Sequence, residues 1–146
     1  MRTVPFPITE AQLNTLLRGA KDGKNSDIGK IAIEVVKLYF LSQDQDCTFK
    51  IGKRNQPDII VTSKGKSTGY EVKGTQDADI AFDKLKVSSK FCRDELINGM
   101  EIIRVTNIRS NVMKLHFLKY GSDFTLVHEA RWAVKEIRDK KRPSLL

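Results

Sequence analysis

Two short stretches decide the fold of this chain: residues 57–61, of sequence PDIIV, and residues 70–73, of sequence YEVK. Each combines β-branched or aromatic residues with charged groups, which is typical of a short strand. Residues 63–67, of sequence SKGKS, lie between them, and their glycine permits a tight turn. We therefore expect a hairpin that brings the carboxylate of Asp58 close to that of Glu71, within a residue or so of register.

Alternation along the second strand predicts which of its side chains reach a common surface. Glu71 and Lys73 share one face of the strand, and Tyr70 and Val72 share the other. With the apolar pair against the core, the charged pair lines the opposite surface. Taken by itself, the E-x-K tripeptide could be an ordinary solvated strand face. The PDIIV stretch that precedes it at hairpin distance favours a functional site instead.

Asp58 and Glu71 together are suited to bind one divalent cation, with the backbone carbonyl of Val72 as a third oxygen. Mg²⁺ is the expected ion because it binds through one or two carboxylates and keeps several waters, and Mn²⁺ is a candidate substitute. Such an ion activates a water for attack on a phosphodiester. We assign Lys73 the role of positioning that water and stabilising charge, since a general base would require a depressed lysine pKa.

The rest of the sequence predicts a mixed α/β domain with a central mixed sheet flanked by helices. The expected helices cover about residues 9–19, 27–42, 88–98 and 128–141, and the expected strands cover 48–51, 58–62, 69–73, 101–106 and 114–119. A capping box at Thr9 opens the first helix, Ser88 caps the third, and the last is strongly basic. The central order is helix, three strands, helix, strand. We expect a single domain over all 146 residues because no repeat or composition break divides them.

The charge balance indicates a polyanionic partner. The chain carries 26 Lys and Arg against 18 Asp and Glu, for a formal net charge of +8. The residues expected to contact a nucleic-acid backbone are Lys53, Arg54, Lys64, Lys66, Gln76 and Lys90. No apolar run reaches membrane-spanning length, the N-terminus lacks a signal-peptide core, and there are two cysteines. We therefore expect a cytoplasmic protein with no membrane partner.

The pattern at residues 57–58 and 71–73 resembles the signature of the PD-(D/E)XK nuclease superfamily, whose core has the same element order. Within it, the chain is most similar to the nuclease-like domain at the C-terminus of the plant protein NO VEIN. That resemblance rests on the sequence YEVKGT at residues 70–75, VS at 87–88, RVTN at 104–107 and KL at 114–115. It implies a restriction-endonuclease-like core, with the first and last helices as additions. The target-recognition element of many restriction enzymes is not evident.

The resemblance also implies residue roles. Asp58 and Glu71 correspond to the metal ligands, Lys73 to the catalytic lysine, and Glu34 to a helical acid that orients metal or water. The leading hypothesis is a Mg²⁺-dependent DNA endonuclease, with RNA as the less favoured substrate. The alternative is a catalytically inactive module of the same fold that binds DNA or a protein partner. A symmetric homodimer would allow cleavage of both strands.

Overall fold

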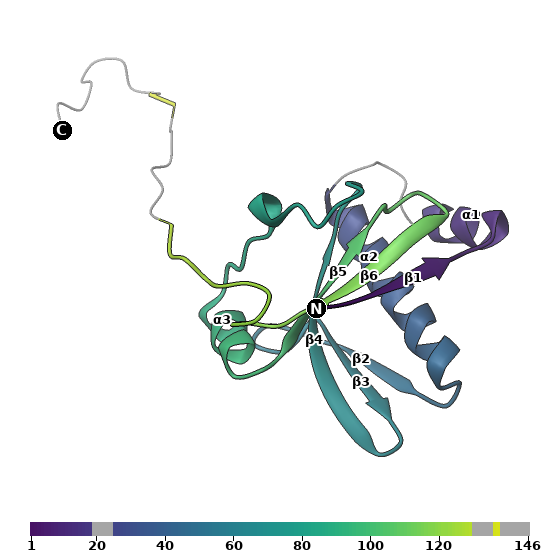
Figure 1. The fold of residues 1–146 in the computed structure, drawn as a ribbon, viewed down its shortest axis with the longest axis horizontal. Helices are drawn as coiled ribbons and strands as arrows, with labels where there is room; N and C mark the ends of the chain where they lie inside the picture. The colour runs from purple at the N-terminus through teal and green to yellow at the C-terminus, as the bar shows by residue number, and fades with distance from the viewer. Residues whose placement is uncertain (19–24, 130–135, 138–146) are drawn as a thin grey trace.

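The computed structural model describes residues 1–18, 25–129 and 136–137 and has an α/β fold built on a six-stranded mixed sheet (Figure 1). The strands are β1 (Arg2–Pro7), β2 (Thr48–Ile51), β3 (Ile59–Ser63), β4 (Lys66–Gly74), β5 (Glu101–Thr106) and β6 (Val112–Leu118). The helices are α1 (Glu10–Arg18), α2 (Asn25–Gln43) and α3 (Lys90–Ile97), with a 3-10 turn, η1, at Phe82–Lys84. The strand order is β1-β6-β5-β4-β3-β2, and β4 and β5 are the parallel neighbours.

The β3–β4 hairpin has the predicted register. A two-residue turn joins the strands, with φ of 51° at Lys64 and 75° at Gly65. Positive φ at both positions is the geometry of a type I′ turn, whose twist matches that of the strands. Ile59 pairs with Tyr70, so one further step along the antiparallel ladder sets Asp58 opposite Glu71.

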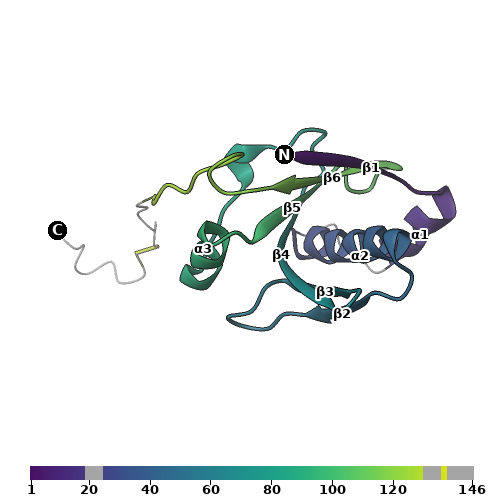
Figure 2. The same ribbon diagram turned by 60° about the horizontal axis from the view of Figure 1, so that its bottom comes forward.

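The helix α2 covers one face of the sheet, which curves around it (Figure 2). Ala32, Val35 and Val36 are fully buried there, in one apolar cluster with Val72 and Phe117. An amphipathic helix of this length is stabilised mainly by such burial.

The short helix α1 adjoins α2, and the predicted capping box forms at its start. The amide of Thr9 donates to Gln12 Oε1 at 2.9 Å, and the amide of Gln12 donates to Thr9 Oγ1 at 3.1 Å. These two bonds satisfy backbone donors that the first turn of a helix leaves unpaired.

The helix α3 lies against the other face of the sheet. Cys92 and Leu96 pack with Ile102 of β5 and Leu118 of β6 in a second apolar cluster. The helix begins one residue later than predicted, because Ser89 is its cap: the Ser89 hydroxyl accepts a hydrogen bond from the amide of Cys92 at 3.1 Å. This cap fixes the first turn of α3 above the strand that carries Glu71.

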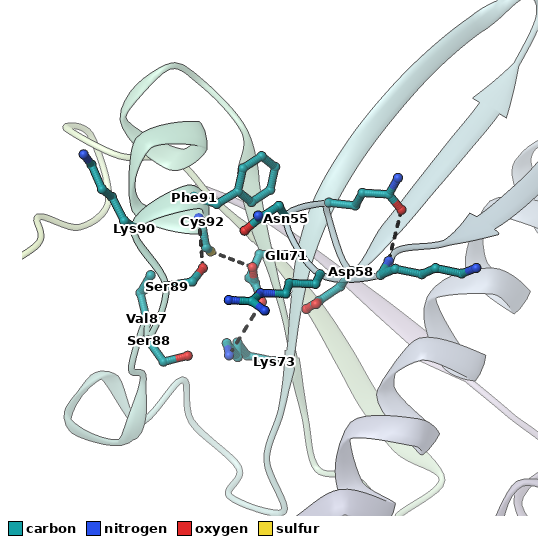
Figure 3. Close-up of a pocket in the computed structure, with 13 residues that line it drawn as sticks. Asn55, Asp58, Glu71, Lys73, Val87, Ser88, Ser89, Lys90, Phe91 and Cys92 are labelled. Carbon is teal, nitrogen blue, oxygen red and sulfur yellow. Dashed lines mark hydrogen bonds and ion pairs between the residues drawn. The ribbon is translucent and has the colours of Figure 1, made fainter.

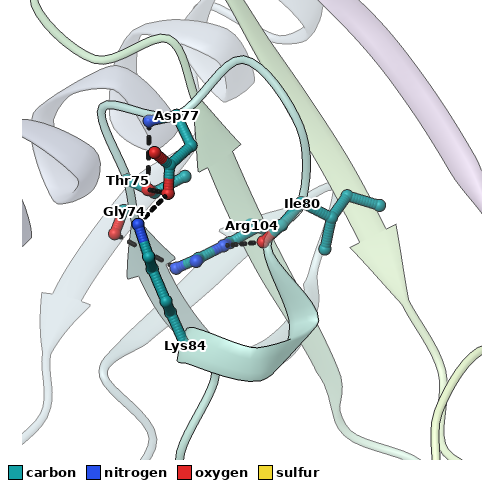
Figure 4. Close-up of polar contacts among 6 residues, drawn as sticks. All are labelled: Gly74, Thr75, Asp77, Ile80, Lys84 and Arg104. Carbon is teal, nitrogen blue, oxygen red and sulfur yellow. Dashed lines mark hydrogen bonds and ion pairs between the residues drawn. The ribbon is translucent and has the colours of Figure 1, made fainter.

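A buried arginine holds the segment that follows β4. Arg104 is 3% exposed, and its guanidinium donates to the carbonyl of Ile80 at 2.8 Å and to that of Gly74 at 3.1 Å (Figure 4). Asp77 accepts from Thr75 Oγ1 at 2.9 Å and from Lys84 Nζ at 2.8 Å. The connection between β4 and α3 is therefore tied to the sheet through charged hydrogen bonds.

From α2 to β5 the elements follow the predicted order of helix, three strands, helix and strand. The strand β1 has no counterpart in the prediction. It pairs with β6 at the edge of the sheet, where its two prolines are tolerated because one side of the strand has no partner. The basic helix expected over about 128–141 falls largely outside the described residues. Among the helices that the structure describes, none is long and apolar enough for a membrane span.

Candidate active site

A pocket of about 540 Å³ opens where the segment before β3, the strand β4 and the start of α3 meet (Figure 3). It contains all three residues of the predicted carboxylate and lysine set, Asp58, Glu71 and Lys73. The other residues that line it are Lys53, Arg54, Asn55, Gln56, Val87, Ser88, Ser89, Lys90, Phe91 and Cys92. Polar and basic groups thus surround two carboxylates.

The backbone of β4 fixes the position of Asp58. The amide of Val72 donates to Asp58 Oδ2 at 2.9 Å. Since Glu71 is the neighbouring residue on β4, the same strand holds both carboxylates side by side. Val72 acts here through its amide, and ligation by its carbonyl oxygen stays a prediction.

Glu71 lies in a confined and crowded environment. It is 8% exposed, and its Oε2 accepts a hydrogen bond from the Cys92 thiol at 2.6 Å. Lys73 Nζ lies 3.6 Å from Glu71 Oε1. Burial, together with the neighbouring Asp58 carboxylate, raises the pKa of Glu71 to about 7, although Cys92 and Lys73 act against the shift.

The thiol of Cys92 is held in its protonated, hydrogen-bond-donating form. Burial raises the pKa of Cys92 above its ordinary value, and the adjacent Glu71 carboxylate raises it further. Cys92 therefore serves as a donor to Glu71 and is poorly suited to be a thiolate nucleophile.

A hard divalent cation fits this pair of carboxylates. Burial is the main cause of the raised pKa of Glu71, and the neighbouring Asp58 carboxylate raises it further. Within the described residues, no three His, Cys, Asp or Glu side chains form a group that could hold a metal. Asp58 and Glu71 are the residues that would hold a cation here, and two carboxylates correspond to a Mg²⁺ ion that keeps several waters rather than to a zinc ion with four protein ligands.

The raised pKa of Glu71 leads to a prediction for the stability of the metal-free protein. The folded pKa is about 7 against an ordinary value of 4.5. This group therefore contributes its full stability below pH 4.5, and the contribution is lost as the pH rises through 7. We expect Glu71→Gln to raise the free energy of unfolding by about 1–2 kcal/mol at pH 8 and to have little effect at pH 4.5. Urea denaturation in EDTA at both pH values measures this, and equal effects at the two would contradict it.

Three of the predicted basic residues reach the pocket and two do not. Lys53, Arg54 and Lys90 line its walls. Lys64 and Lys66 lie at the β3–β4 turn, at the end of the hairpin away from α3 (Figure 1). They are absent from the pocket wall, as is Gln76, which is exposed in the segment after β4.

Glu34 is not brought to the pocket either. Its side chain is 54% exposed and pairs with Lys37 at 3.1 Å on the surface of α2. The reason lies in the alternation of β4: Tyr70 and Val72 pack toward α2, so Glu71 faces away from that helix. The structure thus gives no support to a role for Glu34 beside Asp58 and Glu71.

Several pocket residues were not singled out as site residues in the sequence. Ser88 was predicted only as a helix cap and as part of the family resemblance, and Ser89 was not singled out. Asparagine is common in turns, so the sequence gives no reason to place Asn55 in a pocket. In the structure it has a positive φ of 59°. Cys92 is separated from Glu71 by 21 residues, and no local periodicity connects them. In the sequence, the rarity of cysteine was the one feature that could have pointed to a special role for Cys92.

No family model matches the sequence, and no curated protein or solved structure shows significant similarity to it.

Proposed function

We propose that this protein is a Mg²⁺-dependent nuclease that hydrolyses phosphodiester bonds of DNA. The observation that carries the proposal is the convergence of Asp58, Glu71 and Lys73 in one pocket with basic walls. The P-D…E-x-K resemblance and the order of elements from α2 to β5 add support. A restriction-endonuclease-like core is part of the same proposal.

The carboxylates, Lys73 and the basic residues of the pocket each have a role in this proposal. Asp58 and Glu71 would hold the cation, and the Val72 amide and the Cys92 thiol orient one oxygen of each carboxylate. When bound by these two carboxylates, a Mg²⁺ ion would polarise the scissile phosphate and lower the pKa of a water. Lys73, 3.6 Å from Glu71 Oε1, positions the attacking water and stabilises developing charge. Lys53, Arg54 and Lys90 bind neighbouring phosphates without reading sequence.

The test is cation-dependent cleavage with a matched pair of variants. The wild-type protein should nick plasmid DNA with Mg²⁺ or Mn²⁺ and lose this activity in EDTA. Asp58→Asn should reduce the cleavage rate at least about 100-fold, because the remaining carboxylate alone holds the ion weakly. Asp46→Asn, at an exposed aspartate outside the pocket, is the control and should cleave normally. Cleavage that persists in EDTA or in Asp58→Asn would contradict the assignment.

A second candidate is a nucleic-acid-binding module without catalysis. The small number of acidic ligands in the pocket favours it, since the described residues present no group of three. Retardation of DNA in a gel without nicking in either cation would establish this function instead. Parallel incubation of the protein with DNA and with RNA identifies which nucleic acid it binds.

A further inference from the structure

Phe91 lines the pocket and is not part of either apolar cluster of the described residues. It is the second residue of α3, it is half-buried, and it lines the same pocket as Asn55 (Figure 3). Val87 and Leu96, on either side of it in sequence, do pack into one of these clusters. Among the described aromatic residues it has no ring partner. Core packing therefore does not account for an aromatic side chain here.

The wall across from α3 is preformed and polar. The turn at residues 53–56 is closed by the amide of Gln56, which donates to the carbonyl of Lys53 at 3.1 Å. The side chain of Gln56 in turn accepts from the amide of Lys53 at 3.0 Å. This turn holds Asn55, an exposed residue, at the pocket that Phe91 also lines.

Basic residues adjoin Phe91 and Asn55 in sequence and line the same pocket. Lys90 precedes Phe91 on α3, and Lys53 and Arg54 precede Asn55 on the opposite wall. A flat apolar ring, an amide and flanking cations are complementary to a base face, a base edge and phosphates respectively. The pocket volume of about 540 Å³ is in the range of sites for small organic groups.

We propose that this pocket binds an unpaired nucleotide, whose base stacks on Phe91 and whose phosphate lies toward Asp58, Glu71 and Lys73. Within a duplex both faces of every interior base are already stacked, so a base must be unpaired to use the ring. The preferred substrate class is therefore single-stranded or frayed DNA. This inference rests on the proposed nuclease function for its role in cleavage, while the binding step stands by itself.

The experiment measures binding in EDTA, where no cleavage occurs. The probe is a single-stranded oligonucleotide that contains 2-aminopurine, whose fluorescence is quenched by stacking, and the comparison is the same sequence as a duplex. Wild-type protein should quench the probe and bind the strand more tightly than the duplex. Phe91→Leu should weaken strand binding about 5- to 150-fold, the range typical for loss of one base–aromatic stack, and abolish the quenching. Phe91→Tyr should retain both.

The matched control is Phe82→Leu, which removes a ring that is 48% exposed and lies outside this pocket. It should bind and quench as the wild-type protein does. Unchanged binding and quenching in Phe91→Leu, or tighter binding to the duplex, would overturn the inference. If strand stacking depends on Phe91 but Mg²⁺ gives no cleavage, the nuclease function fails and the inference stands. If Phe91→Leu binds the strand and quenches the probe as the wild-type protein does while Mg²⁺-dependent cleavage is present, the inference fails and the nuclease function stands.

Discussion

Lys73→Ala should reduce the single-turnover cleavage rate at least about 100-fold, while folding and DNA affinity change little. Lys73 is positioned within 3.6 Å of a carboxylate that we assign to the cation, so its loss removes charge stabilisation where the reaction occurs. Its side chain is 33% exposed, and a partly solvated ion pair of this length contributes little to folding. Quenched-flow cleavage with saturating Mg²⁺, circular-dichroism melting and DNA retardation separate these three properties.

Lys37→Ala is the matched control for Lys73→Ala. Lys37 also pairs with a glutamate, Glu34, at 3.1 Å, but it lies on α2, outside the pocket. Its removal should leave the cleavage rate unchanged. Full metal-dependent cleavage by a clean preparation of Lys73→Ala would eliminate Lys73 from the reaction.

Gly52→Ala should destabilise the protein by about 3 kcal/mol or more and displace the wall that carries Lys53 and Arg54. A Cβ at position 52 would lie 1.6 Å from the carbonyl oxygen of Pro57 and 2.7 Å from its carbonyl carbon. Both atoms belong to the backbone, so no rotamer change relieves the clash. The Gly52 amide also donates to the carbonyl of Asp58 at 3.1 Å, and movement there would shift the carboxylate.

Gly29→Ala makes the same chemical change where there is room for it. This glycine lies in α2, and an added Cβ meets no atom within 4 Å. Alanine should stabilise the helix by about 0.5–1 kcal/mol because it loses less backbone entropy than glycine on folding. Urea denaturation of both variants should therefore give shifts of opposite sign. A Gly52→Ala protein as stable as the wild type would contradict the described path of residues 53–57.

The parts of the site that depend on local geometry were predictable from sequence. Alternation along residues 70–73 and a glycine turn between two apolar strands are short-range rules, and they placed Asp58, Glu71 and Lys73 correctly relative to one another. The same rules gave the order of helices and strands from α2 to β5.

The rest of the site depends on which face of the sheet each helix covers. The apolar stripe of α2 predicts that the helix is buried, but it carries no information about which face of the sheet the helix covers. The resemblance implied a role for Glu34, and the structure places this residue on the exposed side of α2, outside the pocket. The contact of Cys92 with Glu71 arises from tertiary packing of α3. The strand β1 was missed because two prolines in six residues argue against a strand unless it is at an edge, and sequence does not reveal the edge.

The two-residue turn between β3 and β4 has a consequence for the order in which the molecule assembles. Closing so short a loop costs little chain entropy, so the hairpin that brings Asp58 beside Glu71 is favoured early in folding. The pairing of β1 with β6 joins Arg2 to Phe117 across most of the chain and incurs the largest closure cost in the sheet. We therefore expect the two acidic groups to meet before the sheet is complete, and early folding to be faster where a proton or a cation offsets their repulsion.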